Sequence, residues 1–381
     1  MKTAKTMLCL SALALSILFI TFSTSSHAAV NNSTKPASTV IASSSESPAC
    51  AGYTIRNDAG QYASFMNNNP TIANGTLYNE WWYFQVESGN IQFFTTIGYA
   101  NPQYLGNSYG IGYIFSGISI NGVKNSTINT NCTNYYDFAS QCSVSSKTLN
   151  TNIGGAASVV GINKDTIQVV GTDKNLGVSF NLTFTRNISP APLHLVQLGP
   201  FSSDFMYHQA FMASATVVGT ITVNGVTRLM NGLGYHDHQW GSPLVLNWQP
   251  WTAIYTKDFA LVSVTSDFAM SGNAYMDFFV NGAWHQLGNP TVTIIKIATD
   301  TTWGFQYPSL LKLSAASDGY SVNLTLKKAG KYWMTDAGAY GVVTPIMKSC
   351  NFEADGCIQQ NGKTIKSIDQ MASIEWLYTI F

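Results

Sequence analysis

Short runs of strand-forming residues, each bounded by turn signals, recur along most of this 381-residue chain. The runs are rich in Val, Ile, Thr, Phe, Tyr and Trp and are flanked by Gly, Asn, Asp or Pro, a pattern typical of β-strands. They span residues 80–86, 91–99, 166–171, 178–186, 213–223, 251–255, 260–265, 274–280, 291–297 and 321–326. No helical periodicity extends beyond two turns. We therefore predict an all-β chain of antiparallel meanders that form barrels or sandwiches.

Two-residue turn signals favour hairpins between these runs. Asn-Gly and Asp-Gly pairs suit type I′ turns, in which both central residues have a positive φ. Such pairs occur at residues 121–122, 224–225, 281–282 and 318–319. Two aromatic-rich segments, 80–83 and 237–240, each precede a series of predicted strands, which favours two similar barrels in tandem. We predict domains at residues 50–230 and 231–381.

The first 28 residues have the three parts of a secretory signal peptide. Lys2 and Lys5 precede an apolar run at 7–22, and Ser26-His27-Ala28 is a small-x-small cleavage site. The run is shorter than the roughly 20 residues that a membrane span needs. We predict cleavage after residue 28, a secreted or periplasmic protein, and no stable membrane span after cleavage. Residues 29–49 are polar and rich in Ser and Thr, which predicts a flexible leader.

Charge and cysteine content narrow the classes of partner and the compartment. Charged residues make up 10% of the chain, against about 25% in a typical soluble domain, and the formal net charge is zero. This balance argues against nucleic acid or an anionic membrane surface as a partner. In an oxidising compartment, Cys132 with Cys142 and Cys350 with Cys357 are close enough in sequence to form local disulfides, and Cys50 is left over.

Residues 234–241 read Gly-Tyr-His-Asp-His-Gln-Trp-Gly, the segment in which residues capable of catalysis or binding are most concentrated. Because strand side chains alternate between faces, we predict one face with His236, His238 and Trp240, and another with Tyr235, Asp237 and Gln239. The flanking glycines would permit close approach of backbone or ligand. One interpretation is that the aspartate and histidines satisfy one another at a barrel rim. We favour a functional role, because buried charge is costly without a partner or a purpose.

A more specific alternative is that the two histidines bind a metal ion. A third ligand could come from His208 or His285, yet no spacing argues for either. The cupin arrangement needs a Glu a few residues further on, whereas residues 242–244 are Ser-Pro-Leu. We therefore predict no metal site.

A second cluster lies at Glu80-Trp81-Trp82-Tyr83. Its aromatic side chains are of the kind that commonly fills barrel interiors. The acid beside two tryptophans is less ordinary, and apolar surroundings would raise its pKa. Asp267 follows a strong strand pattern, where an aspartate is usually a turn or cap residue.

Together the segments 79–84 (Asn-Glu-Trp-Trp-Tyr-Phe) and 232–241 (Gly-Leu-Gly-Tyr-His-Asp-His-Gln-Trp-Gly) resemble a known family. It is the carotenoid 1,2-hydratase (hydroxyneurosporene synthase) and AttH-like family, with kievitone hydratase and the fungal lipocalin-like Diels–Alderases among its relatives. The resemblance covers most of the chain after about residue 50. It implies two tandem lipocalin-like antiparallel β-barrel domains and a site for an apolar small molecule.

The resemblance also implies a chemistry. The family's hydratases add water across a carbon–carbon double bond without an organic cofactor, so no cofactor is expected. Their machinery implies catalytic roles here for His238 and Asp267 and a role for Trp240, which we predict to contact substrate. From the chemistry of the two clusters we add Asp237 and His236 as candidate catalytic residues. We add as candidate substrate contacts Tyr235, Trp81, Trp82, Tyr83 and Glu80. An acid that is protonated near neutral pH would protonate the alkene, and a tryptophan ring face would stabilise the cation.

Three departures separate this sequence from the family pattern. Gln239 stands where an Asn is common, and Thr265 stands two residues before Asp267, where a Tyr is expected. Residues 332–335, Tyr-Trp-Met-Thr, resemble a Tyr-Trp-Glu-Gly motif without its Glu. The hydratase hypothesis therefore competes with a pericyclase or isomerase and with a carrier of an apolar ligand, whereas a serine hydrolase lacks its Gly-x-Ser-x-Gly elbow.

Overall fold

The computed structural model describes residues 58–62, 64, 78–101, 110–121, 123–124, 134–197, 205–242, 248–266, 274–299, 306–329, 333–336 and 345–377. All of them belong to one compact unit, Glu46–Phe381. The predicted signal peptide, the leader and Asp267 lie outside these residues. Within them, no helix is long and apolar enough to cross a membrane. The described part of the chain is almost entirely antiparallel β, as predicted, with a short helix between two strands.

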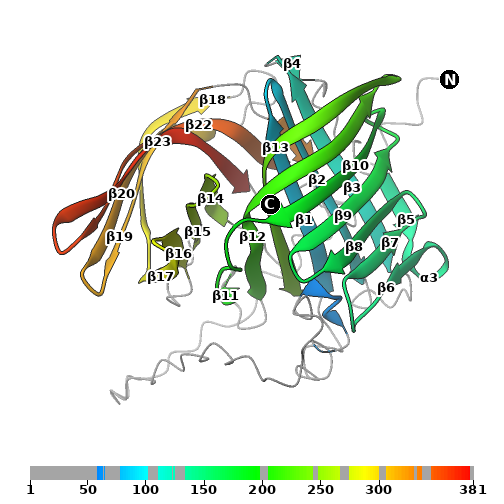
Figure 1. Cartoon of the computed structure of the whole chain (residues 1–381), viewed down its shortest axis with the longest axis horizontal. Helices are drawn as coiled ribbons and strands as arrows, with labels where there is room; N and C mark the ends of the chain where they lie inside the picture. Colours follow the sequence, from blue (N-terminus) through cyan, green and yellow to red (C-terminus); the bar gives the residue numbers. More distant parts are fainter. Residues whose placement is uncertain are drawn as a thin grey trace, which may run out of the picture. The chain divides into compact units, whose positions relative to one another are not determined.

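The first sheet curves into a nearly closed barrel (Figure 1). Its strands follow the order β4-β3-β2-β1-β13-β12-β10-β9-β8-β7-β6, with β11 beside β12 and β5 beside β3. The elements are β1 (Tyr78–Ser88), β2 (Ile91–Asn101), β3 (Ile111–Ile120), β4 (Val123–Lys124), β5 (Asn134–Asp137), α3 (Phe138–Gln141), β6 (Cys142–Val144), β7 (Asn150–Ile153), β8 (Ala157–Asn163), β9 (Thr166–Asp173), β10 (Val178–Arg186), β11 (His194–Gln197), β12 (Phe205–Val223) and β13 (Val226–Ser242).

The second sheet forms a half-barrel in the order β17-β16-β15-β14-β23-β22-β20-β19-β18, with β21 beside β22. Its strands are β14 (Trp248–Tyr255), β15 (Ala260–Ser266), β16 (Tyr275–Val280), β17 (Ala283–Gly288), β18 (Thr291–Thr299), β19 (Gln306–Ser317), β20 (Tyr320–Lys328), β21 (Trp333–Asp336), β22 (Pro345–Gln360) and β23 (Lys363–Leu377). Every candidate strand from the sequence lies within one of these elements, or begins one residue before it.

The hairpin turns have the predicted backbone. At residues 224–225, 281–282 and 318–319, both central residues have φ between 49° and 83°. Asn121 also has a positive φ, and its partner at 122 lies outside the described residues. A further Asn-Gly pair at 361–362 adopts the same conformation between β22 and β23 and was not among the predicted turns. These positions need a residue that tolerates the left-handed region, which explains the Asn, Asp and Gly usage.

Apolar side chains form a core inside each sheet and a third core between the sheets. The interior of the first sheet includes Phe84, Phe93 and Phe184, and that of the second includes Phe278 and Phe352. The third cluster combines residues of both sheets, such as Tyr83, Phe94 and Phe115 from the first and Trp251, Val262 and Tyr275 from the second. The alternating inward and outward pattern of the strands thus buries both faces of β1 and β13.

The predicted domain boundary falls inside a strand, and one cysteine of each predicted disulfide is a free thiol. Residue 230 lies within β13, and the transition from the first sheet to the second follows that strand. The division into two domains stays a prediction. Cys142 and Cys357 are free thiols, whereas Cys132 and the side chain of Cys350 lie outside the described part of the chain.

Candidate functional site

The antiparallel pairing of β1 with β13 brings the two sequence motifs together. Glu80 lies opposite Trp240, Trp82 opposite His238, and Tyr83 opposite Asp237. The end of β13 is closely packed, because a Cβ at Gly241 would overlap the carbonyl oxygen of Phe205 on β12. The flanking glycine therefore permits the close backbone approach that the sequence predicts.

The side chains of this strand pair divide between two clusters, as the period of two requires. Facing residues on paired strands share a face, so His236, His238 and Trp240 join Glu80, Trp82 and Phe84 in the interior of the first barrel. Tyr235 and Asp237 join Trp81 and Tyr83 on the face towards the second sheet. We call the first group, together with Asp58, the inner cluster. The second group, which we call the inter-sheet cluster, consists of polar residues from both sheets: Tyr235, Asp237, Gln239, His208, His194, Tyr275 and Asp277.

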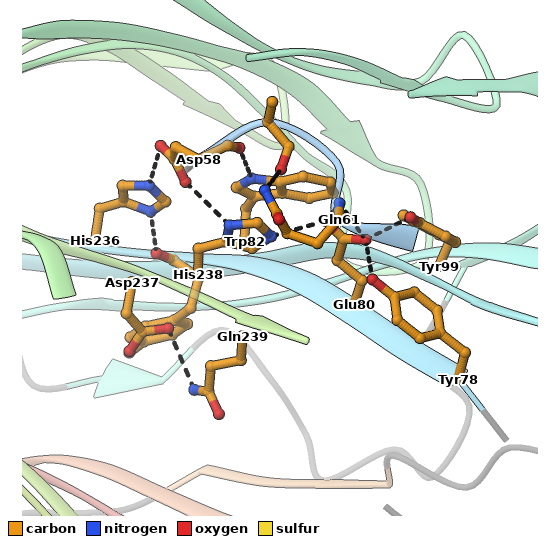
Figure 2. Close-up of polar contacts among 12 residues, drawn as sticks. Asp58, Gln61, Tyr78, Glu80, Trp82, Tyr99, His236, Asp237, His238 and Gln239 are labelled. Atoms are coloured by element: carbon orange, nitrogen blue, oxygen red, sulfur yellow. Dashed lines mark hydrogen bonds and ion pairs between the residues drawn. The ribbon is translucent and has the colours of Figure 1, made fainter. Parts of the chain in front are cut away.

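In the inner cluster, two imidazoles contact two carboxylates (Figure 2). His236 Nε2 lies 2.9 Å from Asp58 Oδ2, and His238 Nδ1 lies 3.5 Å from Asp58 Oδ1. The other nitrogen of His238, Nε2, lies 2.9 Å from Glu80 Oε1. All four side chains are fully buried. The histidines are thus satisfied by acids from elsewhere in the chain, not by Asp237 as the rim interpretation proposed.

Glu80 is held by an unusually complete set of donors. It accepts hydrogen bonds from the Tyr78 hydroxyl at 2.5 Å and from the Tyr99 hydroxyl. The Gln61 backbone amide donates to both oxygens, at 2.9 and 3.1 Å, and the His238 ring is the fourth partner. A carboxylate with this many donors has its charge and lone pairs satisfied. Burial raises the pKa of the Tyr78 and Tyr99 phenols, and the adjacent Glu80 raises it further, so both are hydroxyl donors.

Geometry also sets the protonation of His236. Its Nδ1 lies 2.9 Å from the Tyr83 carbonyl oxygen, which accepts only, so Nδ1 carries a proton. Burial opposes a charge on this ring, but the Asp58 carboxylate outweighs it and raises the pKa of His236 above its ordinary 6.5. The contact with Asp58 therefore favours the charged form of His236. Both rings are also stacked, His236 on Phe84 at 4.1 Å between centroids and His238 on Trp82 at 4.7 Å.

The inter-sheet cluster contains a hydrogen-bonded relay across the two sheets. Asp237 Oδ2 lies 3.2 Å from His208 Nε2, and His208 Nδ1 meets the hydroxyl of Tyr275 on β16. The Gln239 amide donates to Asp237 Oδ1 at 3.3 Å. Burial opposes ionisation of Asp237, but the His208 charge and hydrogen bonds outweigh it and lower the pKa of Asp237. When His208 is neutral, its Nε2–H donates to the Asp237 carboxylate and its Nδ1 accepts the Tyr275 hydroxyl proton; when it is charged, both nitrogens donate.

A second Asp–His pair lies against the same tyrosine. His194 on β11 stacks on the Tyr275 ring with 3.7 Å between centroids and an interplanar angle of 7°. Its Nε2 lies 2.6 Å from Asp277 Oδ2 on β16. Here burial outweighs the histidine and raises the pKa of Asp277. The pKa of Tyr275 is also raised, by burial first and then by Asp277 and Asp237, so the phenol keeps its proton.

Several buried polar atoms of this cluster lack a hydrogen-bond partner among the described residues. They include Asp277 Oδ1, Gln239 Oε1 and the Tyr235 hydroxyl. A buried acceptor without a donor costs free energy, and such atoms in a native protein commonly mark a site for water or a ligand. Asp277 also has a raised pKa, so its free oxygen is the chemically significant one.

The structure divides the predicted site residues rather than assembling them. Glu80, Trp82, His236, His238 and Trp240 lie in the first barrel, whereas Trp81, Tyr83, Tyr235 and Asp237 face the second sheet. Asp267 lies outside the described residues, so its role stays a prediction. No three His, Cys, Asp or Glu residues of the described chain are arranged to hold a metal ion.

Sequence reasoning missed Asp58, His194, Tyr275 and Asp277, and considered His208 only as a metal ligand. One signal was available for two of them. The Tyr two residues before an Asp, which is absent at Thr265 and Asp267, is present at Tyr275-Met276-Asp277. No local pattern distinguishes Asp58 or His194.

Comparison with solved structures shows which fold this chain shares with known proteins. No family model and no curated protein matches the chain. Similar solved structures include an AttH structure from Nitrosomonas europaea, with a TM-score of 0.53 and 12% identity over 79% of this chain and 92% of that one. Kievitone hydratase from Nectria haematococca (TM-score 0.47, 14% identity, 85% and 95% covered) and CghA with Sch210972 (0.46, 11%, 80% and 89%) also align. The match to the AttH structure shows a shared fold.

Proposed function

We propose that this chain is an exported enzyme that adds water to a carbon–carbon double bond of an apolar, isoprenoid-like or prenylated substrate. The observation that carries the proposal is Asp277. It is fully buried beside aromatic side chains, its pKa is raised, and one of its oxygens has no partner in the described chain. A buried carboxyl group with a raised pKa holds its proton more strongly than an ordinary aspartate, and alkene hydration requires an acid of this kind. The motif resemblance to carotenoid 1,2-hydratases and AttH-like proteins supports the same chemistry.

The first step transfers the Asp277 proton to one alkene carbon. The π electrons form the new C–H bond, Asp277 becomes a carboxylate, and the other carbon becomes a cation. Aromatic ring faces stabilise a nearby cation. Tyr83, Trp251 and Tyr275 belong to the apolar cluster between the sheets and supply such faces. His194, at 2.6 Å from Asp277, stabilises the carboxylate that remains.

The second step adds water to the cation and removes a proton from it. The water oxygen forms the new C–O bond, and its released proton needs a base. The Tyr275 hydroxyl takes this proton as it passes its own to neutral His208, and the Asp237 carboxylate stabilises the charge on that ring. Return of a proton from His208 to Asp277 by exchange with solvent restores both groups for the next turnover. The two aspartates have pKa values displaced in opposite directions, which is the usual arrangement for an acid and a base in one site.

The residues inferred from the family resemblance keep a place in the proposal. Asp267 is a second candidate for the acid. His238 and His236 face the interior of the first barrel, so in this proposal they affect catalysis only by holding β13, the strand that carries Asp237. Trp81, Tyr83 and Tyr235 are the predicted substrate contacts on the face towards the second sheet. Export rests on the N-terminal signal pattern at residues 1–28.

The substrate class is tested by native extraction of the exported protein, followed by mass spectrometry of bound small molecules. A pair of ligands that differ by one water is the expected result. The recovered alkene is then incubated with the protein in ¹⁸O-labelled water, and one labelled oxygen should enter the product. A product that lacks the label, with an altered carbon skeleton, would support a pericyclase or isomerase, and an unchanged ligand would support a carrier.

The assignment of the acid is tested by Asp277→Asn and Asp267→Asn side by side. Asp277→Asn should lower kcat by at least about 100-fold, because the amide cannot donate a proton of comparable acidity. His208→Gln and Tyr275→Phe should each slow turnover less, since they act on the water step. If Asp277→Asn keeps full activity while Asp267→Asn abolishes it, Asp267 is the acid and the proposed role of Asp277 is wrong.

A further inference from the structure

Residues 58–62 meet the interior of the first barrel in the manner of a docked peptide. The Asp58 carbonyl oxygen accepts a hydrogen bond from Trp82 Nε1 at 2.9 Å, and the Gln61 amide donates to Glu80. The Asp58 carboxylate itself lies between the two imidazoles of β13 (Figure 2). The nearest of these partners in sequence is 19 residues away, and His236 is 178 residues away. The segment therefore contributes its groups to a site that the barrel builds.

The barrel holds both imidazoles without help from Asp58. His236 is fixed by the hydrogen bond from Nδ1–H to the Tyr83 carbonyl and by its stack on Phe84. His238 is fixed by Glu80 through Nε2 and by its stack on Trp82. Each ring thus has one nitrogen and one face held by the barrel wall, and the remaining nitrogens converge on one carboxylate. His236 Nε2, at 2.9 Å from one Asp58 oxygen, and the His238 ring, at 3.5 Å from the other, are pre-oriented in a buried, low-dielectric position, and this arrangement forms an anion site.

We propose that His236 and His238 form a carboxylate-binding site inside the first barrel, and that Asp58 occupies it as a tethered ligand. The site is separate from the inter-sheet cluster, because its side chains lie on the opposite face of β13. The free ligand that it fits is a small monocarboxylate, since the flanking Trp82, Phe84 and Phe211 rings leave the carboxylate as the recognised group. Removal of the side chain at position 58 opens the site to such an ion.

Size-matched rescue tests this proposal in the full chain. Asp58→Ala removes the volume of a formate ion, and Asp58→Gly removes that of an acetate ion. Each variant should melt roughly 5–10 °C below the parent in chloride, because one partner of a buried pair is lost. Formate should restore at least half of the loss in Asp58→Ala with a saturable dose response, and acetate should do the same for Asp58→Gly. Sodium chloride at equal ionic strength should restore neither.

Two further variants separate specific binding from general salt effects. Asp58→Asn fills the volume with a neutral amide, so formate should have no more effect on it than on the parent. The double variant Asp58→Ala, His236→Phe removes a nitrogen of the site and should lose the formate response. Where Asp58→Ala does not fold in chloride, its refolding yield in formate against chloride is the readout. An unchanged melting temperature in Asp58→Ala, or an equal response to formate and chloride, would overturn the proposal.

Discussion

The two faces of the β1–β13 strand pair carry similar polar residues but differ in how completely those residues are hydrogen-bonded. Each face has two histidines, two carboxyl groups and tyrosine hydroxyls in hydrogen-bonding range. On the inner face Glu80 has four donor groups, and Asp58 Oδ1, which has no hydrogen bond among the described residues, still lies 3.5 Å from His238 Nδ1. On the other face Asp277 and Gln239 each keep a buried oxygen without a hydrogen-bond partner in the described part of the chain. A more fully satisfied cluster stabilises a fold, whereas a less satisfied one retains the capacity to bind and react.

The aspartates and histidines also differ in what their surroundings do to their pKa values. In the inner cluster the Asp58 carboxylate prevails over burial and keeps His236 charged. At Asp277 burial prevails over the histidine and favours the neutral acid. The difference follows from geometry, because His236 donates from both nitrogens whereas Asp277 has one contact. The same residue types thus serve as a structural pair on one face and as a candidate acid on the other.

The largest expected effect is that of Glu80→Gln. The amide group has one acceptor oxygen, so several of the four donors would face an NH₂ group in a dry interior. We expect a loss of about 3–5 kcal/mol in the free energy of unfolding. Urea unfolding followed by tryptophan fluorescence measures it. A loss below about 1 kcal/mol would mean that the inner cluster is less tightly coupled than its geometry indicates.

The pH dependence of stability should come next in size. Because the folded-state pKa of His236 is raised above 6.5, its contribution is complete below that pH and is lost as pH rises through the folded-state value. The melting temperature should therefore fall on the alkaline side of neutrality. His236→Phe should be less stable at acidic pH and should show a flatter profile above 6.5. An unchanged profile in the variant would assign the dependence to another group.

Asp277→Asn should have the smallest effect on stability and the opposite sign to Glu80→Gln. Since the folded-state pKa of Asp277 is raised above 3.8, its ionisation opposes folding increasingly as pH rises through that range. A neutral amide removes this penalty and should stabilise the fold at neutral pH by about 1 kcal/mol, as is common at functional sites. Differential scanning calorimetry at pH 4 and pH 7 measures the gain, which should be larger at pH 7. Marked destabilisation at pH 7 would place Asp277 with the structural pairs.

Local sequence patterns predicted much of the fold and those cluster residues that lie on β1 and β13. The strands and the Asn-Gly turns follow from residue preferences over a few positions, and the two faces of 235–240 follow from the strand period. The partners of those residues could not be predicted in this way. Asp58 reaches His236 across 178 residues, and His208 reaches Tyr275 across 67. These pairings depend on which strands become neighbours, and no short-range periodicity encodes that.

The pairing of β1 with β13 has a consequence for how the chain is made. β1 reaches its second neighbour, β13, only late in synthesis, because Asn79 pairs with Gly241, 162 residues further along the chain. Until then one edge of β1 is open, because only β2 pairs with it, and Asp58 and Glu80 lack the histidines of β13. We expect a slow, late closure of the barrel, with a high contact order. For a chain with a predicted export signal, such a delay would keep the polypeptide extended during translocation, and folding would begin on the far side of the membrane.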